Sequence, residues 1–286
     1  MIPAAFDYLR VATVSDAVAA LGEHGEDAKV LGGGQSLVPL LRLRLSYPEM
    51  VVDVGRVAEM RGVRDDGTHL VIGAMTTHHE VMHDPLVREH AALLAEATAT
   101  VADPAVRHRG TFGGALAHAD PAGDLGAVAL ALDAHMVVAG PEGRRTVAAR
   151  DFFEDYLQTV LGPEDLLVEI RVPKHGQEWG FRYEKFHRVA QAWAIVGVAA
   201  AVRRSNGSIA EARIGLTNMG PTPLHAAAVE TALAGAEASP AAVADAARSA
   251  AQGTSPTADL NAQVDYREHL ARVLTRRAVT TAAHLS

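Results

Sequence analysis

The sequence predicts an α+β protein of two domains. The chain has 286 residues, which exceeds the usual size of a single domain. Hydrophobic residues make up 49% of it, enough for a large core. After residue 177 the pattern changes from short strands and helices to longer strand-like runs followed by alanine-rich helices. We therefore expect a first domain over residues 1–174, with subdomains of about 1–55 and 56–174, a linker at 174–177, and a second domain over 178–286.

The first subdomain is predicted to contain a β-turn-α-β unit. Thr13 and Ser15 precede apolar residues at helical spacing, which indicates a capped helix that ends near Gly22. Pro48 is expected to stop a second helix, because the residue before a proline disfavours helical backbone. The remaining expected elements are a buried strand over 29–31, the leucine-rich helix over 37–45 and a strand over 50–54.

The same periodicities place the later elements. In the second subdomain we expect a strand over 70–72, helical segments over 79–94 and 91–101, a helix over 125–132, and strands over 136–139, 145–147 and 166–172. In the second domain we expect strands over 181–186, 194–203 and 209–216, followed by helices that include an amphipathic one around 266–274. Asn206-Gly207 is a strong hairpin signal between the last two strands, so this sheet is predicted to be antiparallel.

Composition excludes several classes of function. The chain has no cysteine, so it can form neither disulfides, thiolate metal sites nor cysteine-ligated iron–sulfur clusters. Its net charge of −8 argues against nucleic acid as a partner. The N-terminus shows no signal-peptide pattern, and the apolar stretch 192–202 is too short to span a bilayer. We therefore predict no membrane span and a cytoplasmic location.

Two glycine motifs are the strongest functional signals. Residues 30–37 read Val-Leu-Gly-Gly-Gly-Gln-Ser-Leu, and residues 111–114 read Thr-Phe-Gly-Gly. Exposed backbone amides at such turns can bind phosphate, and Gln35 and Ser36 add polar side chains. Neither motif is Gly-x-Gly-x-x-Gly or Gly-x-x-x-x-Gly-Lys-Ser/Thr, so the common nucleotide-binding fingerprints are absent. Each motif alone could also be a tight turn that needs positive φ. A side chain at Gly33 is expected to fill the phosphate concavity.

The second motif extends from Arg107 to Asp124 as a polar, glycine-dense stretch that we interpret as a long functional loop. Together with four other stretches it resembles a known family. These stretches are Gly32–Ser36, Ile72–Thr77, Asp165–Pro173, and Lys185-Phe186 with Ala190–Val196. In this order, over nearly the whole chain, they resemble the FAD-binding medium subunit of the molybdenum hydroxylases, the carbon monoxide dehydrogenase and xanthine dehydrogenase group.

The resemblance implies a fold and a cofactor site. The implied fold is a PCMH-type FAD-binding domain of two subdomains, similar to the vanillyl-alcohol oxidase and MurB flavoproteins, plus a C-terminal domain of antiparallel sheet and helices as in carbon monoxide dehydrogenase flavoproteins. In the family, the first turn holds the pyrophosphate and the second turn contacts it from the other side. The implied FAD-binding residues here are Gly32, Gly33, Gly34, Gln35, Ser36, Thr111, Gly113, Gly114, His118, Asp124, Leu167 and Lys185.

Individual roles follow from the same resemblance. His118 provides a polar contact, Asp124 accepts from a cofactor hydroxyl, Leu167 packs near the flavin ring, and Lys185 lies near the ring's pyrimidine end, where a cation stabilises negative charge. Other interpretations remain open: Lys185 as an exposed charge on an edge strand, Asp124 as a helix N-cap, and Leu167 as core.

Two further residues qualify the resemblance. The position of Asp120 before Pro121 is compatible with a turn residue as well as with a ligand contact. Ala192 stands before Trp193 where the family often has an acidic residue, so a polar contact at the ring or at the partner is missing here.

The implied function is electron transfer within a complex. A large partner subunit would carry the molybdenum cofactor, a small one two 2Fe–2S clusters, and this chain FAD that passes electrons to an external acceptor. The complex is expected to be a heterotrimer or its dimer. Missing cysteines fit this division. The substrate (carbon monoxide, purine, aldehyde or heterocycle) and the acceptor stay open.

Two other functions are compatible with the sequence. One is a stand-alone FAD-dependent oxidoreductase, for which we can name no catalytic residue; the other is a non-catalytic assembly module without flavin. A lone active flavoenzyme would indicate the first, and a protein that stays colourless with FAD the second. His78, His79 and His83 form a cluster, but we interpret it as a solvated helix start and predict no metal site.

Overall fold

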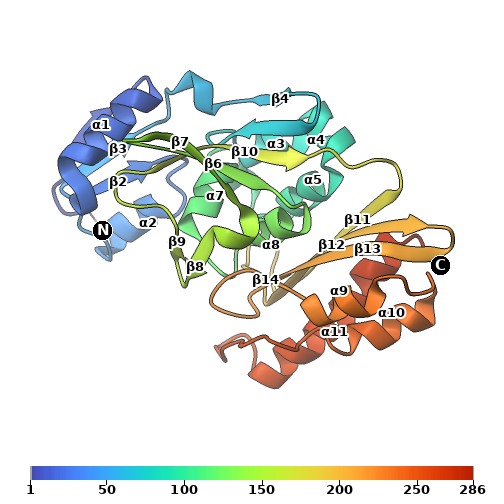
Figure 1. Cartoon of the computed structure of the whole chain (residues 1–286). Coiled ribbons are helices and arrows are strands. Elements are labelled where there is room, and N and C mark those ends of the chain that lie inside the picture. The colour runs from blue at the N-terminus through green and yellow to red at the C-terminus, as the bar shows by residue number, and fades with distance from the viewer. Residues whose placement is uncertain (1, 286) are drawn as a thin grey trace.

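The computed structural model describes residues 2–285 and divides them among three sheets, a small β-hairpin and the helices around them (Figure 1). The N-terminal sheet is parallel with strand order β1-β3-β2. Its strands and helices are β1 (Asp7–Arg10), α1 (Val14–His24), β2 (Ala28–Leu31), α2 (Leu37–Leu43) and β3 (Met50–Asp53). The predicted cap of α1 is confirmed, because Thr13 Oγ1 accepts a hydrogen bond from Asp16 N at 3.1 Å.

One local prediction for this region was wrong, and one strand was missed. Helix α2 ends at Leu43, because Arg44 adopts a left-handed conformation with φ 56° and breaks the hydrogen-bond ladder before Pro48 is reached. Strand β1 was not predicted, since all of its residues are exposed and it lacks the alternation of buried and exposed side chains that marks a strand.

The second subdomain is built on an antiparallel sheet of order β4-β5-β10-β6-β7. Its elements are β4 (Val63–Asp65), β5 (His69–Gly73), α3 (His78–His83), α4 (Pro85–His90), α5 (Ala92–Ala99), α6 (Pro104–Arg107), α7 (Phe112–His118), α8 (Asp124–Ala131), β6 (His135–Gly140), β7 (Gly143–Ala148), the hairpin β8 (Phe153–Asp155) and β9 (Gln158–Thr159), and β10 (Leu166–Pro173). The stretch that we expected to be one long loop therefore contains helix α7, capped by Thr111. Gly113 and Gly114 lie in its first turn.

The C-terminal sheet has the order β11-β12-β13-β14 and is antiparallel, as predicted. Its elements are β11 (Trp179–Phe186), β12 (Val196–Ser205), β13 (Ser208–Thr217), β14 (Leu224–His225), α9 (Ala227–Leu233), α10 (Pro240–Ala247) and α11 (Val264–Ala282). The predicted hairpin turn is confirmed, because Asn206 and Gly207 have φ values of 50° and 80°.

Helix α8 connects the two parts of the chain. It lies between the five-stranded sheet and the C-terminal sheet, whose opposite face is covered by α9, α10 and α11 (Figure 1). The approach is close: a Cβ on Gly215 of β13 would lie 2.1 Å from the carbonyl oxygen of Ala127 in α8. Consequently one hydrophobic core includes residues of both parts, such as Ala127 and Ala199. Among residues 2–285, no helix is both long and apolar enough to cross a membrane.

Candidate cofactor-binding cleft

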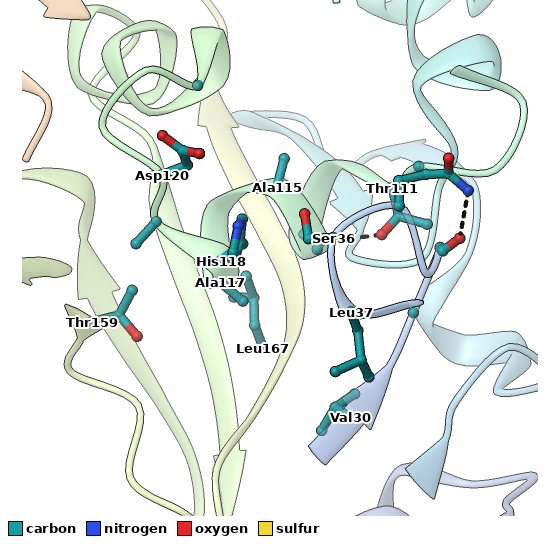
Figure 2. A pocket seen from close by; sticks show the side chains of 18 of the residues that line it. Val30, Ser36, Leu37, Thr111, Ala115, Ala117, His118, Asp120, Thr159 and Leu167 are labelled. Atoms are coloured by element: carbon teal, nitrogen blue, oxygen red, sulfur yellow. Dashed lines mark hydrogen bonds between the residues drawn. The ribbon is translucent and has the colours of Figure 1, made fainter. Parts of the chain in front are cut away.

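A cleft of about 940 Å³ runs between the two glycine motifs and reaches the C-terminal sheet. Figure 2 shows Ser36 and Leu37 on the first motif, Ala115, Ala117 and His118 on α7, and Leu167 on β10 around it. The residues predicted to bind the cofactor all line this cleft: Gly32, Gly33, Gly34, Gln35, Ser36, Thr111, Gly113, Gly114, His118, Asp124, Leu167 and Lys185. A volume of this size suits a large organic cofactor.

The first glycine motif packs directly against the backbone that leads into the second. A Cβ on Gly33 would lie 2.2 Å from the carbonyl oxygen of Arg109 and 2.7 Å from Cα of Gly110. The expectation that a side chain at Gly33 fills the phosphate concavity is therefore wrong, because it would collide with this neighbouring backbone instead. Gly33 is needed for the close approach of two chain segments.

The amides of the first motif are available for a ligand. Within residues 2–285, the backbone N–H groups of Gly33, Gly34, Gln35 and Ser36 donate to no backbone or side-chain acceptor. The side chain of Ser36 makes no capping hydrogen bond, and Gln35 Nε2 donates back to the Gly33 carbonyl at 3.2 Å. Consecutive unpaired N–H groups beside a cleft are suited to an anion such as a diphosphate.

The amides of the second motif are already used inside the protein. Phe112 N donates to the Thr76 carbonyl, Gly113 N to the Ala74 carbonyl at 2.9 Å, and Gly114 N to Thr111 Oγ1 at 3.1 Å. The first two bonds tie α7 to the segment that follows β5. The two motifs thus differ physically: the first offers free N–H donors, and the second uses its N–H groups to hold α7 in place.

Asp124 and Lys185 meet at the far side of the cleft and form an ion pair with a Nζ–Oδ2 distance of 2.8 Å. Their side chains are only 4% and 3% exposed, so the alternative of Lys185 as an exposed edge charge is wrong. Asp124 is not an N-cap either, because Gly123 occupies that position and Asp124 Oδ1 accepts from the hydroxyl of Tyr183 at 2.6 Å. Lys185 Nζ also donates to the Thr100 carbonyl at 3.0 Å.

Burial raises the pKa of the Asp124 carboxyl above its ordinary value, whereas the Lys185 cation and the hydrogen bonds from Lys185 and Tyr183 act in the opposite direction. Burial and the Asp124 charge raise the pKa of Tyr183 well above 10, so its hydroxyl stays protonated and donates. Lys185 uses two of its three donors in these bonds, which leaves one for a bound molecule.

Leu167 and Asp120 line the cleft and also have a structural role. Leu167 is 4% exposed and belongs to the core as well as to the cleft wall. Asp120 Oδ1 accepts from Ala122 N at 2.9 Å and therefore acts as a turn residue, although it also lines the cleft.

Sequence reasoning missed Trp193, which lines the cleft with 56% exposure, and Tyr183, which stands behind Asp124. A signal for Tyr183 existed, because it lies two residues before Lys185 on one strand and therefore shares its face.

Two rings of the histidine cluster lie close to each other. The ring of His79 stacks on His108 at 3.9 Å and lies 4.4 Å from the ring of His83. No group of three or more potential ligands occurs within residues 2–285. The interpretation of the cluster as a solvated helix start is wrong for His78, because this residue is buried and lines the cleft, and burial lowers its pKa to about 4.

Comparisons with known proteins agree with this architecture. Residues 4–175 match the family model of the FAD binding domain in molybdopterin dehydrogenase, and residues 181–282 match that of the CO dehydrogenase flavoprotein C-terminal domain. The carbon monoxide dehydrogenase medium chain of Hydrogenophaga pseudoflava is 42% identical over 99% of this chain and 98% of its own.

Two further comparisons show the range of similarity. The alpha subunit of the 6-hydroxypseudooxynicotine dehydrogenase complex of Paenarthrobacter nicotinovorans is 34% identical over 99% of this chain and 96% of its own. A solved structure of the Hydrogenophaga pseudoflava carbon monoxide dehydrogenase that lacks the Mo-pyranopterin moiety superposes with a TM-score of 0.97, at 44% identity over 99% of this chain and 98% of that one.

Proposed function

The chain belongs to the family of FAD-binding medium subunits of molybdenum hydroxylases, and from this premise we propose how it works. We propose that it takes electrons from 2Fe–2S clusters of a small partner subunit, holds them on FAD and passes them to an external acceptor, while a large partner subunit oxidises the substrate at molybdenum. One observation carries the proposal: the predicted FAD-binding residues, from four separate stretches of sequence, all line one cleft.

The residues of the cleft fit FAD in chemistry. The unpaired N–H groups of residues 33–36 would hold the diphosphate, and the free donor of Lys185 would face the flavin end. Asp124 has both carboxylate oxygens in use, so a cofactor hydroxyl would share an oxygen with Tyr183 or Lys185. When bound, FAD supplies a two-electron carrier, and the protein supplies binding, orientation and charge around it.

The substrate of the complex does not follow from this chain. Relatives at 42% and 34% identity belong to complexes named for carbon monoxide and for 6-hydroxypseudooxynicotine, respectively. The choice of substrate is therefore assigned to the large subunit. The cytoplasmic location predicted from the sequence is part of the proposal, and cell fractionation tests it.

Purification of the chain alone and with its partner subunits tests the function. We expect the chain alone to bind one FAD, seen by its visible absorption, and to show no reduction of that FAD by any substrate of the complex. Addition of the small and large subunits should make the FAD reducible by substrate. Substrate-driven reduction in the chain alone would favour a stand-alone oxidoreductase, and failure to take up FAD would favour an assembly module.

A further inference from the structure

Tyr183 lies behind the Asp124–Lys185 pair and does not itself line the cleft. Its side chain is 4% exposed, and its hydroxyl donates to Asp124 Oδ1 at 2.6 Å while Lys185 Nζ donates to Asp124 Oδ2 at 2.8 Å. A single carboxylate thus accepts one bond from a neutral donor and one from a cation. Asp124 begins α8, whereas Tyr183 and Lys185 come from β11, so the bonds cross between the two parts of the chain.

The space around the Tyr183 hydroxyl is closely fitted. Gly197 faces it from the adjacent strand β12, and a Cβ there would lie 2.5 Å from the hydroxyl oxygen and 3.0 Å from Cβ of Thr217. A glycine at this place leaves room for the hydroxyl and for nothing larger. The hydroxyl is therefore held in one position, directed at Asp124.

We propose that Tyr183 is a positioning residue that keeps Asp124 ionised, so that the Asp124–Lys185 pair presents a balanced charge to the cofactor. The proposal rests on the proposed function. A buried carboxylate without sufficient donors takes up a proton, since burial disfavours its charged form. If Asp124 became neutral, the Lys185 cation would lose its counter-charge at the flavin end of the cleft.

Burial raises the pKa of Asp124, and a small set of neighbouring groups opposes this effect. Lys185 and Tyr183 bond to it, and His187, beyond the end of β11, adds a charge effect in the same direction as Lys185. The groups that lower the pKa of Asp124 therefore come from β11 and the residue just after it. Removal of the Tyr183 hydroxyl takes away one of the two direct donors without changing any formal charge.

Tyr183→Phe tests the proposal, with the full-length chain loaded with FAD. Infrared difference spectra should show a protonated-carboxyl band in the variant at a proton concentration roughly tenfold lower than in the unchanged protein, the effect expected for loss of one hydrogen bond to a charged group. The band should be absent in the double variant with Asp124→Asn. The midpoint potential of the bound FAD should shift to a more positive value at neutral pH, because the neighbouring cation is less compensated.

Tyr8→Phe is the matched control. The hydroxyl of Tyr8 also donates to a carboxylate, that of Asp53, but neither residue lines the cleft. This control should leave the flavin potential and the Asp124 carboxyl band unchanged.

The outcomes separate the two hypotheses. If the unchanged protein binds no FAD, the proposed function fails. If FAD binds normally and Tyr183→Phe moves neither the carboxyl band nor the potential, Tyr183 is only a packing residue and the inference is overturned while the function stands.

Discussion

Gly33→Ala is the sharpest test of how the first glycine motif is built. The added Cβ would lie 2.2 Å from the carbonyl oxygen of Arg109, whereas real Cβ contacts essentially never fall below 3.0 Å, so the backbone must move by at least 0.8 Å. The neighbouring atoms belong to backbone, of Arg109 and Gly110, and cannot rotate away as a side chain could. We therefore expect a loss of stability of about 1–3 kcal/mol, as for other overpacked sites.

The same movement displaces the free amides of residues 33–36. A hydrogen bond to a charged group contributes about 1.5–3 kcal/mol, so misalignment of one such bond weakens FAD binding by roughly tenfold to a hundredfold. Fluorescence titration of the apoprotein with FAD measures the Kd, and urea unfolding of the same sample measures the stability. Both should change together, because both effects come from one collision.

Gly22→Ala is the matched control, since Gly22 is exposed in α1 and its Cβ would meet nothing nearer than 3.9 Å. It should stabilise the protein by about 0.5–1 kcal/mol and leave the FAD Kd unchanged. The reasoning is refuted if Gly33→Ala keeps both the stability and the FAD Kd of the unchanged protein.

Three other changes have defined outcomes. Lys185→Met leaves Asp124 buried without its cation and should lower the free energy of unfolding by about 3–5 kcal/mol at about pH 8. The loss should be smaller near pH 5, where Asp124 can take up a proton. Urea unfolding at both pH values checks this, and an equal loss at both would contradict it. His78 has a folded-state pKa of about 4, below its ordinary 6.5. Between these pH values the unfolded chain binds a proton on His78 more readily than the folded protein does, so the free energy of unfolding decreases as pH falls. His78→Leu should remove about 2 kcal/mol of the stability loss between pH 7.5 and 5, measured by the same method, and an unchanged pH dependence would exclude a buried neutral His78. Gly207→Ala forces a residue with a Cβ to φ 80° in the β12–β13 turn and should lower stability by about 1 kcal/mol in thermal unfolding, with no effect on FAD binding.

The sequence predicted the elements with strong periodicity and missed those defined by contacts. The hairpin at Asn206-Gly207 was predictable because its turn chemistry is local. The end of α2 was not, because Arg44 takes a left-handed conformation that its residue type does not favour. Helix α7 was hidden because glycines weaken a helix, and here Thr111 supplies a cap that compensates only in the folded arrangement.

In the site too, the residues that belong to motifs were predicted, whereas the contacts between them were not. Residues that were carried over by motif lie together on one cleft, since the motifs preserve their place in the fold. The contacts among them were not predictable: Lys185 and Asp124 are 61 residues apart in sequence, and their pairing depends on how α8 packs on the C-terminal sheet. The role of Tyr183 follows from that pairing and has no separate motif.

Gly33 and Gly113 allow neighbouring chain segments to pack closely. Gly33 is pressed against the backbone of Arg109, and Gly113 against Ala74, whose Cβ would lie 2.3 Å from an added Cβ. Three chain segments, around residues 33, 74 and 110, thus lie in close contact, with a glycine at each contact. The amides of the second and third segments bond to one another, through Gly113 N and the Ala74 carbonyl, whereas those of residues 33–36 find no partner. The first segment thus uses its carbonyl groups within the chain, since the Gly34 carbonyl accepts from Val38 N and the Ser36 carbonyl from Leu40 N, whereas its N–H groups remain for the ligand.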